Sequence, residues 1–183
     1  MKGLILLANY FEDVEALITI DMLRRAKITI DMISLNETKE VTTQSNIIIH
    51  ADKTYHDVNF DDYSFLIIPG GKATFLTHHH SEFTKNAVDH FMNKHQLIAC
   101  ICAAPSVLGI YGYLDNKEFT CFPSCEEYIP KGIYLKNQDV VVTDNIITSK
   151  AAGTTFNFSY EIIKYLTTKD TAEKILSSVY YKK

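Results

Sequence analysis

Cys102 stands where an apolar run ends and a helical pattern begins. The run Leu97–Ile101 is short and wholly apolar, and two small residues and Pro105 directly follow the cysteine. A tight turn between a strand and a helix exposes a side chain at the carboxyl end of a parallel sheet, where free amides and the helix dipole stabilise a thiolate. The pattern therefore predicts a reactive thiolate at Cys102. Burial as a small hydrophobic residue, the commonest fate of a cysteine, fits the local spacing equally well.

A Pro-Gly-Gly turn, residues 69–71, ends a second apolar run, Phe65–Ile68. Such a turn presents bare backbone to its surroundings. Because neighbouring strands of a parallel sheet end at one edge, the amide of Gly71 and an amide after Cys102 could together form an anion site of the oxyanion type. A simple turn that terminates the strand is an equally good interpretation of this motif.

Three acidic residues follow the first apolar run of the chain, namely Glu12, Asp13 and Glu15. Helix N-termini favour acidic residues, so Glu12 and Asp13 need no function to explain them. Glu15 lies one turn into the predicted helix. Burial there would raise its pKa and let it donate a hydrogen bond to a thiolate.

Short apolar runs alternate with helical patterns along the chain. Strands are predicted over residues 4–8, 28–35, 65–68, 97–101, 140–142 and 146–148, and helices over residues 14–26, 83–94, 105–114, 153–166 and 171–179. This alternation is typical of βαβ units, in which helices cover both faces of a parallel sheet. Two less regular stretches, residues 36–62 and 115–139, favour small antiparallel hairpins. The expected fold is an α/β sandwich with a mostly parallel central sheet, and residues 1–183 are expected to form a single domain.

The composition limits the classes of partner. Hydrophobic residues make up 46% of the chain and charged residues 22%, as in an ordinary globular protein. The net charge of −4 gives no long-range attraction for phosphate backbones, so nucleic acid is not an expected partner. No apolar run approaches the roughly 20 residues that span a membrane, so we expect a soluble, cytoplasmic protein without membrane partners. A reducing compartment would leave the 4 cysteines as thiols.

Taken together and in order, the motifs of this chain resemble the DJ-1/PfpI superfamily, and most closely its DJ-1/YajL/ThiJ-like branch. The stretches that carry the resemblance are Glu12-Asp13-Val14-Glu15, Asp21-Met22-Leu23-Arg24-Arg25-Ala26, Pro69-Gly70-Gly71, Ile101-Cys102-Ala103-Ala104-Pro105 and Thr148-Ser149-Lys150-Ala151-Ala152-Gly153-Thr154. Each motif is weak alone, but their order is specific and they span nearly the whole chain.

The resemblance implies a fold and a set of site residues. The fold would be a flavodoxin-like three-layer sandwich, similar to class I glutamine amidotransferases, and the protein would be a homodimer. Cys102 would be the nucleophile and Glu15 its protonated partner. Gly71 and Ala103 would supply the backbone donors of the oxyanion site.

The chain departs from its protease-like relatives at the residue after the nucleophile. PfpI-type members carry a histidine there, and class I glutamine amidotransferases carry a histidine and a glutamate further downstream. Here Ala103 follows Cys102, and no histidine occurs after His95. The spacing of the other histidines gives no reason to prefer one as a partner of the thiol. An intracellular protease with a catalytic triad is therefore disfavoured.

The expected pocket has a more apolar wall than in human-type DJ-1 proteins. Those proteins place a histidine before the proline of a loop beside the site, whereas this chain has Phe122 before Pro123. Gly70 and Cys121 are the other expected pocket residues. The position at which many relatives place an arginine is occupied by Ser45 or Asn46, which weakens the expectation that an anionic substrate binds there.

The remaining cysteines and histidines have simpler interpretations. Cys121 could approach Cys102 and act as a resolving thiol, whereas Cys100 is expected to lie inert in the sheet. The spacing of the four cysteines, Cys125 included, argues against a zinc site. Consecutive side chains of residues 78–80, all histidine, point in different directions, which favours a solvated loop or a helix start. No metal and no cofactor is expected.

Two classes of function follow. The first is a cofactor-independent glyoxalase or deglycase that acts on small α-oxoaldehydes such as methylglyoxal or on glycated proteins. The Cys102 thiolate would attack the aldehyde, Glu15 would move the proton between adjacent carbons, and the amides would hold the oxyanion. The second is a redox-responsive stress protein or chaperone without robust turnover, in which Cys102 is oxidised to a sulfinate stabilised by protonated Glu15.

Overall fold

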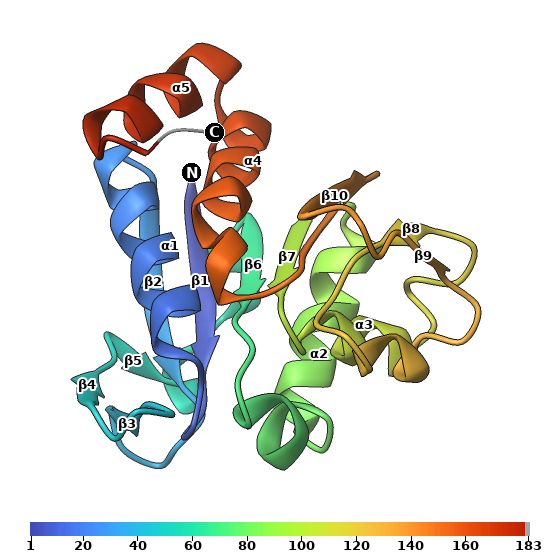
Figure 1. Ribbon diagram of the computed structural model, residues 1–183. Helices are drawn as coiled ribbons and strands as arrows, with labels where there is room; N and C mark the ends of the chain where they lie inside the picture. Colours follow the sequence, from blue (N-terminus) through green and yellow to red (C-terminus); the bar gives the residue numbers. More distant parts are fainter. Residues whose placement is uncertain (182–183) are drawn as a thin grey trace.

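Seven strands form the central sheet of the computed structural model, which describes residues 1–181 (Figure 1). The strand order is β10-β11-β7-β6-β1-β2-β5. The strands are β1 (Lys2–Leu7), β2 (Thr29–Ser34), β5 (Lys53–Thr54), β6 (Phe65–Ile68), β7 (Leu97–Ile101), β10 (Val140–Thr143) and β11 (Ile146–Ser149). All neighbours in this sheet are parallel except β10 and β11, which form an antiparallel edge. The predicted mostly parallel sheet is confirmed.

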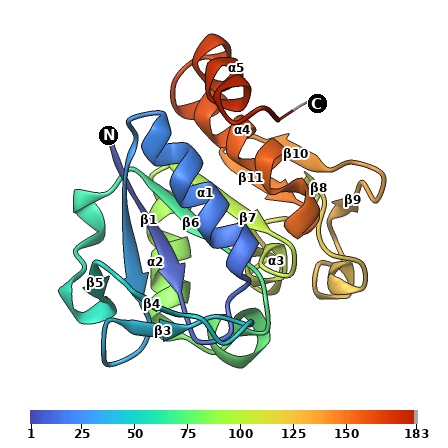
Figure 2. The same cartoon turned by 60° about the vertical axis from the view of Figure 1, so that its left-hand side comes forward.

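Helices cover both faces of the sheet, which gives three layers (Figure 2). The helices are α1 (Asp13–Arg25), α2 (Glu82–Asn93), α3 (Pro105–Ile110), α4 (Thr155–Leu166) and α5 (Lys169–Ser178). Ile5 and Leu7 of β1 belong to the core under α1, α4 and α5, whereas Leu4 and Leu6 belong to the core under α2 and α3. Successive side chains of a strand point to opposite faces, so a strand buried on both sides reads as a continuous apolar run. The predicted α/β sandwich of the flavodoxin-like type is confirmed.

The irregular stretches follow the sequence pattern only in part. In the first, β3 (Glu40–Thr42) and β4 (Ile48–His50) form the expected antiparallel hairpin. In the second, β8 (Glu118–Phe119) pairs with β9 (Ile133–Tyr134) in parallel, so the expected antiparallel hairpin over residues 115–139 was wrong. The segment between these two strands contains the 3₁₀ helix Cys125–Tyr128, which makes room for the crossover that a parallel pair requires. Within residues 1–181, no helix is long and apolar enough to cross a membrane.

Candidate active site

Cys102 lies in a strained turn between β7 and α3, which we call the elbow. Its φ is +65°, a left-handed value that costs a residue with a Cβ about 1–3 kcal/mol. Two hydrogen bonds hold this conformation in place. The Cys102 amide donates to the carbonyl of Ser149 at the end of β11, 2.9 Å away, and the Cys102 carbonyl accepts from the Phe122 amide at 2.8 Å. The thiol is half-buried, whereas the thiols of the other three cysteines are buried.

Two glycines let the ends of neighbouring strands approach closely. Gly71 has a φ of +86°, and a Cβ at this position would lie 2.5 Å from the Glu12 amide nitrogen. A Cβ at Gly70 would lie 2.7 Å from the Cys102 Cβ and 2.8 Å from Glu15 Oε2. All three contacts are closer than real Cβ atoms allow, so only glycine fits at either position. The turn after β6 therefore brings α1 and the elbow at Cys102 together.

Glu15 projects from the first turn of α1 into this junction. The carboxylate of Glu12 caps the helix by accepting a hydrogen bond from the Glu15 amide at 2.8 Å. The Glu15 side chain is buried, and its Oε2 accepts from the Gly70 amide at 2.8 Å. The other oxygen, Oε1, is buried without a hydrogen-bond partner among the described residues, and the neighbouring Cys102 thiol lowers the pKa of this carboxyl group. Oε1 is therefore the oxygen that is free to exchange a proton with the sulfur.

The pKa of Glu15 is raised to about 7, chiefly by burial and to a smaller extent by the negative charge of Glu12. The hydrogen bonds from Cys102 and from the Gly70 amide act in the opposite direction. A carboxyl group with this pKa is half ionised near neutral pH and can both accept and donate a proton.

Burial also raises the pKa of the Cys102 thiol, and the charge of an ionised Glu15 raises it further. The amides of Ala103 and Gly71 donate hydrogen bonds to the sulfur and lower the pKa. Sulfur and carboxyl group thus share their protons as a coupled pair. Beside an ionised Glu15 the sulfur keeps its proton as a thiol, and the thiolate forms only when Glu15 takes the proton. The predicted thiolate is therefore tied to the protonation of Glu15.

A cavity of about 450 Å³ opens above the sulfur. Its lining residues are Glu12, Glu15, Gln44, Gly71, Lys72, Phe75, Cys102, Ala103, Phe122, Cys125, Ala151, Ala152 and Gly153. The cavity thus brings together the two predicted side chains and the two predicted backbone donors. Of the four further predicted pocket residues, Phe122 lines the cavity, whereas Gly70 lies behind Glu15 and contacts it through its amide.

The prediction that Cys121 and Pro123 line the pocket was wrong. Neither is among the lining residues in the described part of the chain. Cys121 is fully buried in the core beneath α2 and α3, where burial raises the pKa of its thiol to about 12. Successive residues of an extended segment point to opposite sides, so a loop that turns Phe122 toward the cavity turns Cys121 into the core. The thiol that shares the cavity with Cys102 is Cys125.

Several lining residues were not predicted from the sequence. Lys72 directly follows the Pro-Gly-Gly turn, and Phe75 lies one turn further, so both could have been found from their position next to Gly71. No local signal marks Gln44 or Cys125, because each comes from an irregular loop. Ser45, at the expected arginine position, donates from its hydroxyl to the Asp13 carboxylate at 3.0 Å instead of lining the cavity.

The run of three histidines leads into the start of α2, as one of the two expectations had it, but of the three side chains His80 alone is exposed. His78 is fully buried, its Nδ1 lies 3.2 Å from the Thr84 hydroxyl, and burial lowers its pKa to about 4. The run begins at the last residue of a single π-helical turn, Thr74–His78, which contacts α3 and buries Thr74 and His78. His79 is partly buried, and its Nε2 lies 2.8 Å from the Ser106 hydroxyl. None of the histidines in residues 1–181 lines the cavity above Cys102.

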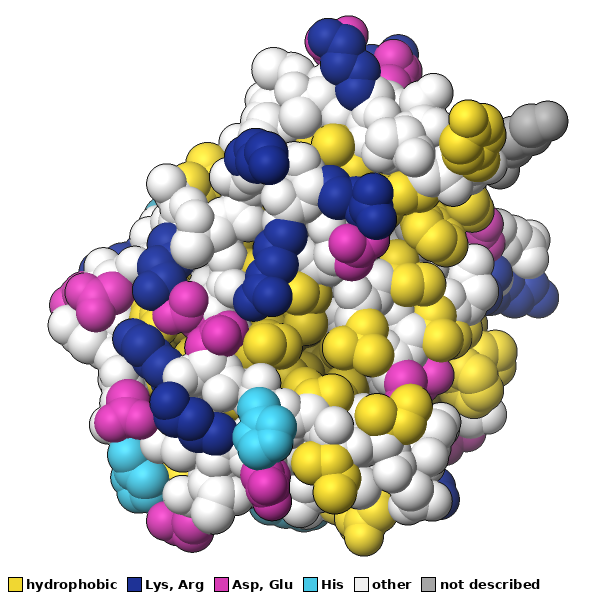
Figure 3. Space-filling model, turned by 90° about the vertical axis from the view of Figure 1, so that its left-hand side faces the viewer, with side chains coloured by type: hydrophobic (Ala, Val, Ile, Leu, Met, Phe, Trp, Pro, Cys, Tyr) yellow, Lys and Arg dark blue, Asp and Glu magenta, His cyan; other side chains and the backbone are white. Residues whose placement is uncertain are grey.

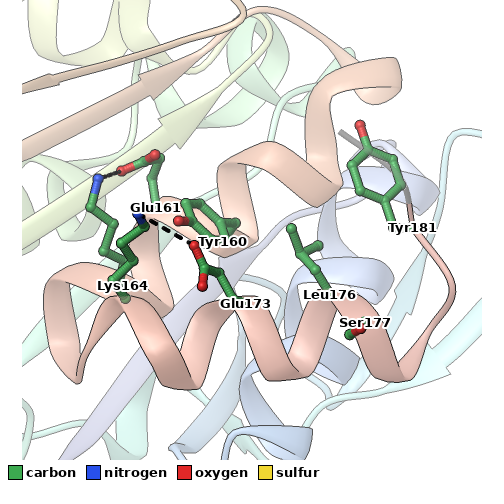
Figure 4. A pocket seen from close by; sticks show the side chains of 8 residues that line it. Tyr160, Glu161, Lys164, Glu173, Leu176, Ser177 and Tyr181 are labelled. Carbon is green, nitrogen blue, oxygen red and sulfur yellow. Dashed lines mark hydrogen bonds and ion pairs between the residues drawn. The ribbon is translucent and has the colours of Figure 1, made fainter.

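A second hollow lies on the surface between α4 and α5 (Figure 4). Its volume is about 510 Å³, and its charged groups are paired with each other. Lys164 lies 2.9 Å from Glu161, and Lys169 lies 3.5 Å from Glu173. The lining residues include neither a thiol nor a buried carboxyl group, so the chemistry points to the cavity at Cys102.

Comparisons with known proteins point to one family. Residues 1–165 match the model of the DJ-1/PfpI family. The chain is 31% identical over 180 residues to "Protein DJ-1alpha" of Drosophila melanogaster, covering 97% of this chain and 83% of the relative. It is 28% identical to "Glutathione-independent glyoxalase DJ-1" of Schizosaccharomyces pombe, with 98% of each chain covered. The crystal structure of Drosophila melanogaster DJ-1beta superposes with a TM-score of 0.93 at 28% identity, covering 100% of this chain and 98% of that one.

Proposed function

The chain belongs to the DJ-1/PfpI family, and from this premise we propose that it is a cofactor-independent glyoxalase. Its substrates would be α-oxoaldehydes such as methylglyoxal, and its product a 2-hydroxy acid. The observation that carries this proposal is the coupling of Cys102 to Glu15 beneath an open cavity, with the amides of Gly71 and Ala103 directed at the sulfur. The Schizosaccharomyces pombe relative that is named a glutathione-independent glyoxalase supports the same class of reaction.

The first step forms a bond between Cys102 Sγ and the aldehyde carbon. The thiol proton passes to Glu15 as the sulfur attacks, because a carboxylate with a pKa of about 7 is a suitable base near neutral pH. The aldehyde oxygen becomes an oxyanion that accepts hydrogen bonds from the Gly71 and Ala103 amides. Glu15 then returns the proton to this oxygen, which leaves a hemithioacetal and an ionised carboxylate.

The second step moves hydrogen between adjacent carbons. Ionised Glu15 removes the hydrogen on the sulfur-bonded carbon as a proton and delivers it to the neighbouring carbon. The hydroxyl proton of the hemithioacetal moves to the neighbouring oxygen. The result is a thioester of lactate, which water hydrolyses to lactate and the free Cys102 thiol. We include early adducts of α-oxoaldehydes with proteins among the substrates, which would make the protein a deglycase as well.

The burial of the four thiols favours a second function. Cys102 is half-buried and the other three cysteines are buried, so an oxidant reaches Cys102 first. The same amides of Gly71 and Ala103 would donate hydrogen bonds to a negatively charged sulfur–oxygen group. The second candidate is therefore a redox-responsive stress protein or chaperone in which oxidation of Cys102 is the signal.

A turnover assay on the purified protein tests the first function against the second. We expect sustained lactate formation from methylglyoxal, with many turnovers per protein molecule, measured by chromatography of the product. A parallel sample receives mild peroxide and is analysed by intact-mass spectrometry and peptide mapping. Selective gain of oxygen at Cys102 without lactate formation in the untreated sample would favour the redox function over the glyoxalase.

We also propose that the protein is a homodimer. Exposed apolar side chains, namely Val14 and Leu17 of α1 and Ile47 and Ile48 of the β3–β4 hairpin, support this proposal. Figure 3 shows the side of the molecule that carries these elements, and hydrophobic side chains gather in the middle of that face. Light scattering at micromolar concentration should give twice the mass of one chain, and Leu17→Asp should shift the mass toward one chain. A wild-type mass of one chain would refute the dimer.

A further inference from the structure

Two phenylalanine rings stand partly exposed in the wall of the cavity above Cys102. Phe75 is 37% exposed and Phe122 is 48% exposed, and both line the cavity. Most of the other lining side chains are small and apolar, among them Ala103, Ala151 and Ala152. Apolar rings that face an open cavity leave area that a ligand can remove from water.

The ring of Phe75 is held in position by its aromatic neighbours. Phe75 packs edge-on against His79, with ring centroids 5.2 Å apart, and against Tyr128 at 5.6 Å. The Ser106 hydroxyl donates to the Ala103 carbonyl at 2.6 Å, so its oxygen accepts from His79 Nε2 at 2.8 Å. The aromatic cluster Phe75, His79 and Tyr128 is thereby tied to the elbow helix α3. Burial lowers the pKa of His79, which keeps this cluster neutral at neutral pH.

Phe122 is tied to the nucleophile itself. Its amide donates to the carbonyl of Cys102 at 2.8 Å, and the preceding residue, Cys121, is anchored in the core. The backbone of Phe122 is therefore hydrogen-bonded to the residue that would attack the substrate, and its ring lines the cavity. An aromatic ring at this place would contact the substituent on the carbonyl that is attacked.

The size of the cavity exceeds what methylglyoxal fills. A water molecule takes up about 30 Å³ in the liquid, so a cavity of about 450 Å³ holds a ligand much larger than a molecule of three carbon atoms. Methylglyoxal would leave both rings in contact with water. A substrate with a planar apolar group would instead cover them.

The charges of the wall favour a substrate without net charge. Besides Glu15, the charged side chains that line the cavity are Glu12 and Lys72, one of each sign. They offer no net attraction to an anion or a cation. Ser45, which hydrogen-bonds to Asp13, stands where the resemblance implied an arginine, so that positive charge is absent from this position.

We propose that the preferred substrates of this site are neutral α-oxoaldehydes that carry an aromatic ring, with the ring placed between Phe75 and Phe122. This inference rests on the proposed glyoxalase function and names its substrate class. Contacts between aromatic rings add affinity beyond that from the burial of apolar area. A tenfold gain in affinity needs only a small gain in binding free energy.

The test compares phenylglyoxal with methylglyoxal on the purified protein, with mandelate and lactate as measured products. The wild type should show a kcat/KM for phenylglyoxal about tenfold or more above that for methylglyoxal. Phe122→Ala and Phe75→Ala should each lower this ratio about tenfold, and Phe122→Tyr should keep it. Phe156→Ala is the matched control, because Phe156 stacks on Tyr181 and does not line the cavity. This control should leave the ratio unchanged.

The outcomes separate this inference from the function on which it rests. Turnover of methylglyoxal with no preference for phenylglyoxal, or a preference that both alanine variants retain, would overturn the inference and leave the glyoxalase in place. A change of oligomeric state in Phe122→Ala by light scattering would also overturn it, because the ring would then cover an interface. No turnover of either aldehyde would refute the glyoxalase. In that case, calorimetry on Cys102→Ala tests the aromatic subsite without turnover. Mandelate should bind about tenfold more tightly than lactate, and equal binding would refute the aromatic subsite.

Discussion

Replacing Cys102 with alanine should lower kcat/KM for lactate formation from methylglyoxal by about a thousandfold or more, as expected when a covalent nucleophile is lost. The loss should not come from unfolding. Alanine carries a Cβ as cysteine does, so the strain at a φ of +65° is the same in both proteins. The two hydrogen bonds that hold the elbow involve only backbone atoms of residue 102 and also remain. The rate is measured by product chromatography, and circular dichroism checks the fold.

Cys100→Ala is the matched control for this variant. Cys100 lies in β7, two positions before Cys102, but its side chain is buried in the core under α2 and α3. The control removes the same atoms at the cost of a small cavity, and its rate should stay within about threefold of the wild type. Cys102→Ala with a rate within tenfold of the wild type would show that the sulfur does not attack the substrate.

Glu15→Gln should lower the same rate by a factor of about 10² to 10⁴, the usual contribution of general acid–base catalysis. Glutamine can still accept a hydrogen bond from the Gly70 amide through its side-chain oxygen, so the geometry of the turn is kept. It cannot take the Cys102 proton or carry a proton between carbons. The pH dependence of the wild-type rate should show a step near 7, the pKa of Glu15, and the variant should lack it. A variant that keeps the full wild-type rate would exclude Glu15 as the proton carrier.

The same substitution should change how stability depends on pH. The pKa of Glu15 is raised from 4.5 to about 7 by folding, so between these values the folded state binds more protons than the unfolded state. The stabilising proton is present below pH 4.5 and is lost as pH rises through 7. This group therefore lowers the free energy of unfolding by about 3 kcal/mol between pH 4.5 and alkaline pH.

Urea unfolding at pH 5.5 and pH 8.5 measures this effect. The wild type should lose stability over this interval, and Glu15→Gln should lose much less because its side chain does not titrate. Glu82→Gln is the control, since Glu82 is an exposed carboxylate on α2 outside the cavity. It should follow the wild-type pH profile. Parallel profiles for Glu15→Gln and the wild type would show that Glu15 does not hold a raised pKa.

The strands of the core and the motifs at their ends were predictable because their signals are local. Phe65–Ile68 and Leu97–Ile101 are apolar runs closed by turn residues, and the structure gives both strands the predicted bounds. Parallel strands end at one edge of the sheet. The strand pattern alone therefore predicts that residues following the strands, such as Gly71 and Cys102, lie close together. The acidic residue one turn into α1 reaches the same edge for the same reason.

The walls of the cavity were not predictable because irregular loops supply them. Gln44 comes from the β3–β4 hairpin and Cys125 from a 3₁₀ turn, and no periodicity determines which way such loops direct a side chain. Cys125 lines the cavity in place of the predicted Cys121, because the extended segment at Cys121 turns that side chain into the core. The burial of His78 has the same origin, since its surroundings are made by the Thr84 hydroxyl and the elbow helix and not by its sequence neighbours.

The two backbone hydrogen bonds that hold the elbow determine when the site can form as the chain is synthesised. Glu15 leaves the ribosome early, and Cys102 follows many residues later. The elbow conformation, however, depends on the Phe122 amide and on the carbonyl of Ser149, which are made later still. A nascent chain that ends before β11 lacks the bond to Ser149 and so loses one of the two restraints on the strained geometry of Cys102. The surroundings that the proposed activity requires are therefore complete only once most of the chain has emerged.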